Sequence, residues 1–335
     1  MTERLRVATF NLENLDDKLG QKPSFEARAA LMRPQLVRLD ADVLCLQEIH
    51  AQEAANGDGR ELAALRKLLE GTPYEDYEIA STTGEDGAPL PQRNLVILSH
   101  PKIVERNQYL HHFSPPPLYQ LVTADPPANK PEEMKAERPL LHARIELGGD
   151  RRLDVVNVHL KSKLPTTIPG QKLPAPRDFA WKSASGWAEG FFVSSMRRVG
   201  QALETRMLVD DLFNEDQNAL IAVCGDFNAD TDDVPLQAIR GDVESTENMD
   251  LSHQVLVPCE KSIPEPARYS YLYHGKGQMI DHVLVSRSLL EFYRGSEIHN
   301  ELLHDENVAF ATDEKYPESD HAPVVAHFEL PTNSS

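Results

Sequence analysis

The sequence contains no long hydrophobic run, and this absence limits where the protein can reside. No apolar stretch approaches the ~20 residues that a helix needs to span a bilayer, so we expect no transmembrane segment. The first residues, MTERLRVATFNLENL, pass directly from a charged start into a strand-like run. They lack the apolar core and the small-residue cleavage pattern of a secretory signal. We therefore expect a cytoplasmic protein.

Cysteine is also scarce. Only Cys45, Cys224 and Cys259 occur, and no CxxC pair indicates a zinc or redox site. Cys45 and Cys224 lie in strand-like runs, where a free cysteine acts as a small buried hydrophobic side chain. The odd number of cysteines and the absence of paired motifs fit a reducing compartment.

Positive charge is in deficit, with 34 Lys and Arg residues against 53 Asp and Glu residues and a formal net charge of −19. A chain this acidic is not expected to coat nucleic acid through its overall electric field. A local basic patch or a bound cation can still reverse the sign of the potential at one place. The hydrophobic fraction of 40% and the charged fraction of 26% are ordinary for a globular protein.

Strand patterns dominate the chain, and helical patterns lie between them. The strand-like runs are LRVATFNL, ADVLCLQEI, NLVILS, KIVERNQYL, PLLHARIEL, RLDVVNVHL, NALIAVCGDF, QMIDHVLVS and APVVAHFEL. PLLHARIEL and RLDVVNVHL are predicted to form a hairpin through Gly148 and Gly149. This order predicts a single α/β domain over residues 1–335, in which helices cover the sheets.

Helical spacing is clearest in three places. SFEARAALMRPQLVRLD predicts a helix with Ser24 as its N-cap and a kink or break at Pro34. GRELAALRKLLEG predicts a short amphipathic helix that ends at Gly71. SSMRRVGQALETRMLVDDLFN predicts the longest helix, with Ser194 or Ser195 as its N-cap.

Two irregular insertions interrupt the pattern, near residues 111–138 and 163–193. Loops this long inside a compact domain are usually functional or disordered. The second insertion holds five aromatic residues, which argues against disorder. The segment from His159 to Arg198 contains seven Lys and Arg residues and only two acidic residues. Such a segment is typical of a groove wall that attracts phosphate and stacks bases. The alternative is a solvated loop whose aromatic side chains anchor it to the core.

Polar side chains collect at the ends of the predicted strands. They are Asn11, Gln47, Glu48, Asn157, His159, Lys161, Asp226, Asn228, Asp281, Asp320 and His321. A single Asp or Asn at a strand end is usually a turn residue. Together, however, these residues supply carboxylate and amide oxygens, which suit a hard cation such as Mg²⁺, Mn²⁺ or Ca²⁺. The histidines suit proton transfer or stabilisation of a transition state.

Six short stretches carry a family resemblance. TFNLEN, LCLQEI, VNVHLKS, GDFNAD, IDHVLVS and SDHAPV occur in this order between Thr9 and Val324. They resemble the signature stretches of the endonuclease/exonuclease/phosphatase superfamily, which includes secreted deoxyribonucleases and abasic-site endonucleases. The resemblance implies an α/β four-layer sandwich, with two packed mixed β-sheets flanked by helices. It also implies hydrolysis of a phosphodiester by metal-activated water.

The resemblance also implies roles for individual residues. Asn11, Glu48 and Asp320 are the implied metal ligands, and Mg²⁺ is the expected ion, with Mn²⁺ or Ca²⁺ as alternatives. The implied catalytic residues are His159, Asp226, Asn228, Asp281 and His321. Asp226 and Asn228 position the attacking water and the phosphate, and Asp281 orients His321. Arg138 and Lys161 are the implied substrate-binding residues.

Some points stay open at this level. Glu13 stands where repair-type nucleases often carry an Asp, so its part in metal binding is undecided. No glutamate near Arg93 is available to pair with His159, and the tyrosine of the abasic-site enzymes has no obvious counterpart. Gly225 is expected to permit the turn after its strand.

The substrate is the least determined property, because a fold hosts many functions. A nuclease-type phosphodiesterase acting on DNA or RNA is favoured, with the basic aromatic insertion in its support. A phosphodiesterase or phosphatase for a lipid headgroup or a small phosphoester is the alternative. A non-catalytic binding module is third, and the retention of the full polar set argues against it. A monomer is favoured.

Overall fold

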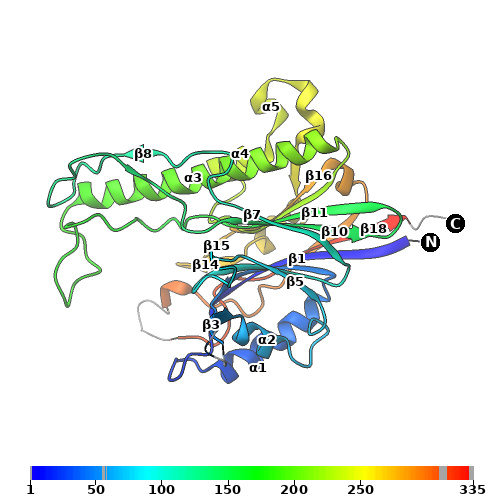
Figure 1. Ribbon diagram of the computed structural model, residues 1–335, viewed down its shortest axis with the longest axis horizontal. Helices are drawn as coiled ribbons and strands as arrows, with labels where there is room; N and C mark the ends of the chain where they lie inside the picture. The colour runs from blue at the N-terminus through cyan, green and yellow to red at the C-terminus, as the bar shows by residue number, and fades with distance from the viewer. Residues whose placement is uncertain (1, 55–56, 58, 309–314, 332–335) are drawn as a thin grey trace.

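Two mixed β-sheets form the centre of the molecule in the computed structural model, which describes residues 2–54, 57, 59–308 and 315–331 (Figure 1). The first sheet has the order β17 (Tyr293–Ile298), β18 (Val324–Pro331), β1 (Thr2–Leu15), β2 (Val43–Ile49), β6 (Asn94–Ser99) and β5 (Glu78–Ser81). The second has the order β13 (Leu256–Pro258), β16 (Asp281–Ser286), β12 (Leu220–Asp226), β11 (Arg151–His159), β10 (Leu140–Leu147) and β7 (Ile103–Tyr109). Each sheet contains one parallel pair near its centre, β1 with β2 and β11 with β12.

Three apolar cores explain the layers. One core lies between the sheets and includes Val7, Ile97, Val155 and Val283, because alternate residues of each strand point inward. A second core joins the outer face of the first sheet to helices α1 (Phe25–Leu39) and α2 (Ala63–Leu69). A third joins the outer face of the second sheet to α3 (Ala184–Glu215) and α4 (Val234–Arg240). The fold is therefore the expected α/β sandwich of four layers.

The remaining elements are short. The helices are α5 (Val243–Thr246), α6 (Arg287–Leu290), η1 (Met249–Gln254), η2 (Cys259–Ser262) and η3 (Glu265–Ala267). The two-stranded ribbons pair β3 (Gln52–Glu53) with β4 (Arg60–Glu61), β8 (Leu118–Tyr119) with β9 (Glu132–Glu133), and β14 (Tyr271–Tyr273) with β15 (Lys276–Gln278). The predicted hairpin is confirmed, since β10 and β11 pair antiparallel from Leu141 with Asn157 to Leu147 with Arg151.

Helix α1 matches the prediction at its start and differs at its centre. Ser24 is the N-cap, and its side chain accepts a hydrogen bond from the amide of Ala27. The helix is not broken at Pro34, which lies inside it. Met32 and Leu36, on either side of the proline, are both fully buried against the sheet. Tertiary packing therefore holds the helix together across a residue that removes one of its hydrogen bonds.

Helix α3 begins at Ala184, and its N-cap lies eleven residues before Ser194, the first of the two predicted N-caps. Ser183 is the N-cap and accepts from the amide of Gly186 at 3.0 Å. Gly186 and Gly190 weaken the helical pattern in the sequence, because glycine is a poor helix former. In the folded chain they allow close packing: a Cβ on Gly190 would lie 2.5 Å from the carbonyl oxygen of Thr166.

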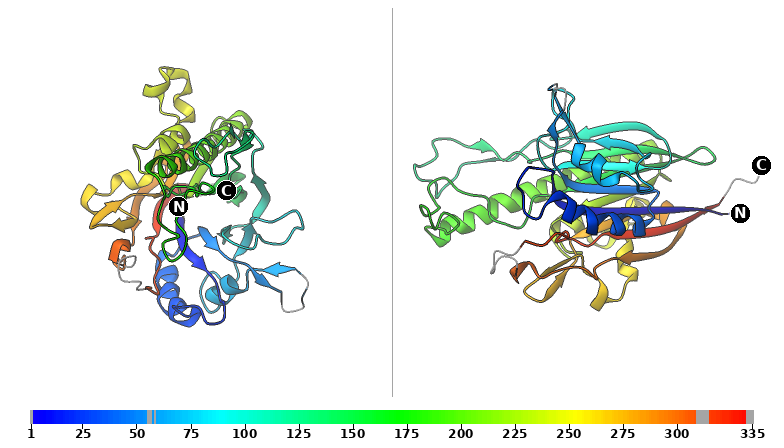
Figure 2. Two further views of the ribbon diagram at one scale, coloured as in Figure 1. Left: turned by 90° about the vertical axis from the view of Figure 1, so that its left-hand side faces the viewer. Right: turned by 90° about the horizontal axis from the view of Figure 1, so that it is seen from below.

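The two insertions pack on the amino-terminal half of α3 and project with it beyond the sheets (Figures 1 and 2). We call residues 111–138, residues 163–183 and this half of α3 the arm. Its apolar centre comprises Met134, Ile168 and Val193, with Tyr119, Leu121, Ala124, Trp181 and Met196 packed around them. Glu189 of α3 accepts hydrogen bonds from the amides of Val122 and Thr123. The insertions are thus an ordered unit, and both are needed to build it.

The described part of the chain also tests the expectations about transmembrane helices and about the cysteines. None of its helices, α3 included, has both the length and the apolar character required to cross a bilayer. Cys45, Cys224 and Cys259 all fall within the described residues, and each is a buried free thiol.

Candidate active site

Three of the predicted site residues lie in a row across the second sheet. His159 ends β11, Asp226 ends β12, and Asp281 begins β16. The strand register places His159 beside Asp226 and Asp226 beside Asp281. Residues in register point to the same side of a sheet, so all three side chains meet at one edge.

The first sheet supplies the opposite wall of the site. Asn11 near the end of β1 donates from Nδ2 to Oδ2 of Asp226 at 3.1 Å. Glu48 at the end of β2 accepts from the amide of Asn14 at 3.0 Å through Oε2. Its other oxygen lies 3.7 Å from Nε2 of His159. The polar ends of both sheets therefore converge on one centre, as the sequence predicted.

Four of the ten non-glycine residues with positive φ in the described chain lie around this centre. Glu13, Asn14, Glu48 and Asn228 all have positive φ angles, between 44° and 61°. A residue other than glycine in this region costs about 1–3 kcal/mol, and such residues gather at functional sites. The strain near Asn11 coincides with a shift in register between β1 and β2.

Gly225 has a different role from the one expected, because it lies inside β12 and not in the turn. Its φ angle is 142°. A Cβ at this position would lie 1.9 Å from the carbonyl oxygen of Val158 in the neighbouring strand β11. The turn itself follows at Asn228, whose φ angle is 47°. Glycine is thus required for the close approach of two strands that carry catalytic candidates.

This geometry predicts the effect of adding one methyl group. Gly225→Ala is expected to lower the free energy of unfolding by about 3 kcal/mol, the upper part of the usual overpacking range. The measurement is urea unfolding, read as a lower midpoint with an unchanged slope. Gly295→Ala, where a Cβ would meet nothing within 4 Å, is the matched control. Equal stability of both variants would contradict the explanation.

Asp226 is the most connected group in the site. Its Oδ1 accepts from the amide of Asn228 at 2.8 Å, and its Oδ2 accepts from the Asn228 side chain at 3.1 Å. Nε2 of His159 lies 3.2 Å from the same Oδ2. Burial raises the pKa of Asp226 to about 7, with Asp281 adding to the rise and His321 opposing it. A carboxylate with such a pKa is suited to accept a proton near neutral pH.

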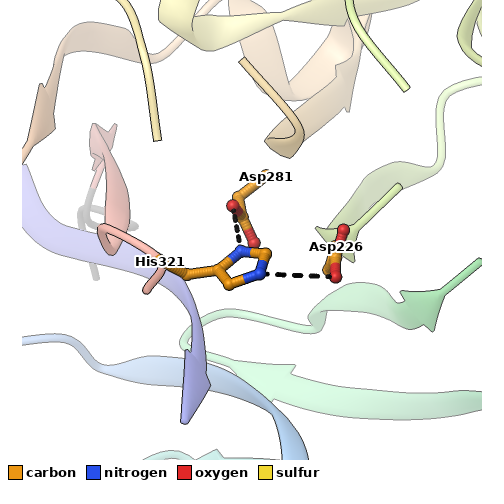
Figure 3. A group of neighbouring side chains, drawn as sticks. All are labelled: Asp226, Asp281 and His321. Atoms are coloured by element: carbon orange, nitrogen blue, oxygen red, sulfur yellow. Dashed lines mark hydrogen bonds and ion pairs between the residues drawn. The ribbon is translucent and has the colours of Figure 1, made fainter. Parts of the chain in front are cut away.

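His321 forms a carboxylate–imidazole pair with Asp281 (Figure 3). Its Nδ1 donates to Oδ2 of Asp281 at 2.7 Å, and its Nε2 lies 3.9 Å from Oδ2 of Asp226. Burial alone would lower the pKa of His321, but Asp281, Asp320 and Asp226 raise it well above its ordinary value. The ring is therefore an imidazolium, with one N–H fixed by Asp281 and the other directed toward Asp226.

His159 has the opposite character. Burial, together with the cations Arg138 and His321, lowers the pKa of His159 well below its ordinary value. Nδ1 accepts from the guanidinium of Arg138, so Nε2 carries the proton and lies 3.2 Å from Oδ2 of Asp226. The partner that the sequence left undefined is thus Arg138. The pKa shifts of the two histidines that flank Asp226 are opposite: that of His159 is lowered, which favours the neutral ring, and that of His321 is raised, which favours the imidazolium.

The predicted substrate-binding residues lie beside the site but are not open to solvent. Arg138 is 5% exposed, and its second amino group lies 3.5 Å from Oε2 of Glu137. Lys161 follows β11 and lies 2.9 Å from Oε1 of the same Glu137. Both cations therefore share one carboxylate in this structure.

Three further residues support the site without having been identified in the sequence. Ser270 donates to Oδ2 of Asp281 at 2.7 Å, and Ser319 donates to the carbonyl oxygen of Asn11 at 2.7 Å. The ring of Tyr271 lies 5.6 Å from that of His321. Ser270 and Tyr271 lie outside the six stretches, and Ser319 begins the stretch SDHAPV, but nothing local in the sequence indicates the partners of these side chains; only the fold brings them together.

A buried ion pair anchors the turn that carries Asn228. His282 bonds Glu260 through Nδ1 and the carbonyl oxygen of Ala229 through Nε2. Both ring nitrogens act as donors, so the ring is an imidazolium. Burial acts against this form, but Glu260 raises the pKa of His282 above its ordinary value. Both side chains are fully buried.

Glu260→Gln is therefore expected to lower the free energy of unfolding by about 3–5 kcal/mol, because it leaves a buried cation without its partner. Since the folded pKa is raised, this stabilisation is complete below pH 6.5 and declines as pH rises through the folded value. Urea unfolding at about pH 6 measures it. Glu265→Gln, an exposed change nearby, is the control. A difference within about 0.5 kcal/mol, typical of surface changes, would contradict this assignment.

A metal ion fits the oxygen donors of this edge. Asp226, Asp281 and His321 place one potential ligand atom each within 4.8 Å of one another (Figure 3). Nδ1 of His321 is bonded to Oδ2 of Asp281, however, which leaves only Nε2 of this ring as a potential ligand. Within the described chain, Oδ1 of Asp320 is buried and has no hydrogen-bond partner. Burial, together with Glu306 and Glu48, raises the pKa of Asp320 to about 6. This excess of negative charge suits a bound cation.

The chain belongs to the endonuclease/exonuclease/phosphatase family, because residues 8–321 match the sequence profile described as "Endonuclease/Exonuclease/phosphatase family". The resemblance drawn from the six stretches is thereby confirmed. Enzymes of this family are phosphoesterases that use divalent metal ions, and the protein is accordingly a hydrolase that acts on ester bonds. None of the curated proteins matches the chain in sequence.

Solved structures share the fold at low sequence identity. A family member from Bacteroides thetaiotaomicron has 14% identity and a TM-score of 0.58, over 100% of this chain and 98% of its own. An AP endonuclease from Archaeoglobus fulgidus has 16% identity and a TM-score of 0.51, over 97% and 99%. A variant of the 3′ phosphatase NExo from Neisseria, bound to a product DNA hairpin, has 17% identity and a TM-score of 0.52, over 97% and 99%.

Proposed function

We propose that this protein is a divalent-metal-dependent phosphodiesterase that cleaves P–O bonds in nucleic acid. The observation that carries the proposal is the setting of Asp226 between a neutral His159 and a protonated His321, at the edge where Asn11 and Glu48 also meet. A base, an imidazolium and oxygen ligands are the groups that phosphoester hydrolysis requires.

Each group has a defined part in the proposed reaction. Asn11, Glu48 and Asp320 are the residues that would hold a divalent metal ion, which would supply positive charge against the negative charge of the phosphate. Asp226 accepts the proton of the attacking water, while Asn228 orients the phosphate. The imidazolium of His321 donates a hydrogen bond to a phosphate oxygen, and Asp281 keeps it charged and aligned. His159 holds Asp226 in place from the other side.

The surroundings of the site favour nucleic acid. Seven Lys and Arg residues against two acidic ones lie between His159 and Arg198, and this segment forms much of the arm beside the site. Phosphate attraction needs such a local patch in a chain of net charge −19. The two structural relatives described as an AP endonuclease and as a phosphatase with a DNA hairpin support the same substrate class.

A phosphodiesterase for a lipid headgroup is the second candidate, and exposed apolar side chains of the arm favour it. Phe179, Trp187 and Phe192 are 69%, 46% and 51% exposed. Such residues at one end of a molecule can enter a membrane interface as well as stack on bases.

The discriminating experiment compares three substrates in Mg²⁺, Mn²⁺ or Ca²⁺: supercoiled plasmid, bis-p-nitrophenyl phosphate, and phospholipid vesicles. Nicking of the plasmid supports the nuclease proposal. Hydrolysis of the small diester with an intact plasmid and cleaved lipid would shift the assignment to the second candidate. No turnover of any of the three would contradict both.

Removal of the metal gives a further prediction. Treatment with EDTA is expected to reduce hydrolysis of bis-p-nitrophenyl phosphate to background, because the carboxylates of the site then repel the anionic substrate. Addition of Mg²⁺ or Mn²⁺ in excess of the chelator is expected to restore the rate. Full activity in EDTA would contradict metal dependence.

A further inference from the structure

Three cations from separate parts of the fold converge on one carboxylate next to the site. Lys161 after β11 lies 2.9 Å from Oε1 of Glu137, and Arg197 of α3 lies 3.7 Å from the same atom. Arg138 lies 3.5 Å from Oε2. Glu48 and Asp226 also act on Arg138 from the side of the active site, whereas Glu137 is the carboxylate that contacts all three cations.

The cations are held more firmly than the carboxylate between them. The side chains of Lys161, Arg138 and Arg197 are 16%, 5% and 20% exposed, whereas that of Glu137 is 37% exposed. Glu137 can therefore rotate toward solvent while the cations stay in place. Nε of Arg197 is also buried without a hydrogen-bond partner in the described chain. A buried donor of this kind is available to an acceptor from outside the chain, either a water molecule or an anion.

Helix α3 fixes the geometry of this cluster. Gln201 accepts from the amide of Lys161 at 2.8 Å. Arg198 donates to the carbonyl oxygens of Lys161 and Ser162 at 3.0 and 2.9 Å. The backbone that carries Lys161 is thus clamped to the helix that carries Arg197, and the two cations are held ready for an anion.

The cluster is connected to the site through one imidazole ring. Arg138 contacts Nδ1 of His159, and Nε2 of that ring lies 3.2 Å from Asp226 and 3.7 Å from Glu48. An anion bound by the three cations would therefore lie beside the reacting phosphate, on the side of α3 and the arm.

We propose that Lys161, Arg138 and Arg197 form a subsite for a second phosphate, the one that flanks the scissile bond in a polynucleotide. Glu137 occupies this subsite in the free enzyme and is displaced by the substrate. The inference rests on the proposed function and adds to it a substrate class: a chain with neighbouring phosphates, in preference to an isolated diester. If the cluster only holds residues 111–138 against α3, Glu137 is a structural partner and no anion replaces it.

Binding and kinetics of Glu137→Gln test the proposal. A labelled single-stranded oligonucleotide is titrated in the presence of Mg²⁺, with every variant made in the Asp226→Asn background, so that the metal is present and binding is measured without appreciable cleavage. Loss of the competing carboxylate is expected to lower its Kd about tenfold, the equivalent of 1.4 kcal/mol. Arg197→Gln is expected to raise the Kd about tenfold and to reduce the slope of log K against log salt by about 0.7, one phosphate contact on a single strand. Glu133→Gln is the matched control, because Glu133 pairs with Lys135 on the surface of the same segment.

The kinetic readout is the ratio of kcat/KM for the oligonucleotide to kcat/KM for bis-p-nitrophenyl phosphate, which has no flanking phosphate. The ratio is expected to rise in Glu137→Gln and to fall in Arg197→Gln. Weaker or unchanged oligonucleotide binding by Glu137→Gln would overturn the subsite, as would an unchanged salt slope in Arg197→Gln. Failure of the wild-type protein to cleave either substrate would overturn the proposed function, and the binding data would then decide the subsite by themselves.

Discussion

Asp226→Asn is expected to lower kcat for a phosphodiester by about 10²–10⁴-fold, the usual contribution of a positioned general base. The substitution keeps the shape of the side chain but removes its basicity. It also changes the environment of both histidines, because Oδ2 of Asp226 lies between them. Nε2 of His159 lies 3.2 Å from this oxygen, and Nε2 of His321 lies 3.9 Å from it. The measurement is the steady-state rate on bis-p-nitrophenyl phosphate at saturating metal.

A control separates loss of chemistry from loss of the fold. Asp232→Asn lies in the same loop, at an exposed position, and is expected to retain the wild-type rate. Thermal unfolding of both variants should match the wild type, because the amide preserves most contacts of residue 226. A fall of less than tenfold for Asp226→Asn would show that another group accepts the proton.

His321→Ala is the second change with a large expected effect, again about 10²–10³-fold in kcat, as found for removal of one preorganised donor at a developing charge. The imidazolium is stabilised because Asp281, Asp320 and Asp226 raise the pKa of His321 well above its ordinary value, against the effect of burial. The raised pKa favours the protonated, donating form of the ring at neutral pH. The rate should fall through kcat, because the donor acts on charge that grows in the transition state.

The pH profile identifies this donor. Asp281→Asn removes the carboxylate that contributes most to the raised pKa of His321. The ring should then lose its proton at lower pH, so the alkaline limb of the kcat profile is expected to move to lower pH, with about 10–100-fold loss at neutral pH. A limb that stays in place would mean that His321 does not set it. Ser270, which also bonds Asp281, should give a smaller shift in the same direction when changed to Ala.

The sequence was most informative about the candidate site residues that lie at the ends of strands. Asn11, Glu48, His159 and Asp226 were predicted from the polar residues that end apolar runs. The structure brings them together because parallel neighbours such as β11 and β12 end at the same edge. Their chemical roles stay predictions. The sandwich was likewise implied by six stretches in order, and the family assignment supports it.

What the sequence could not provide was the set of partners made by distant loops. Arg138 was expected to touch phosphate, but its contact with His159 depends on a segment 21 residues earlier in the chain folding over β11. The start of α3 was misplaced because Gly186 and Gly190 reduce helical propensity locally, while the packing of residues 163–183 against them is non-local. Of the two outcomes predicted at Pro34, a kink or a break, the break does not occur, because burial of α1 outweighs one lost hydrogen bond.

The most direct test of the central claim is the release of p-nitrophenolate from bis-p-nitrophenyl phosphate by three preparations side by side. These are the wild-type protein with Mg²⁺ or Mn²⁺, the same protein in EDTA, and Asp226→Asn with metal. The account predicts turnover in the first and a rate lower by at least about 10²-fold in the other two. Equal rates in all three would contradict hydrolysis by a metal-assisted site centred on Asp226.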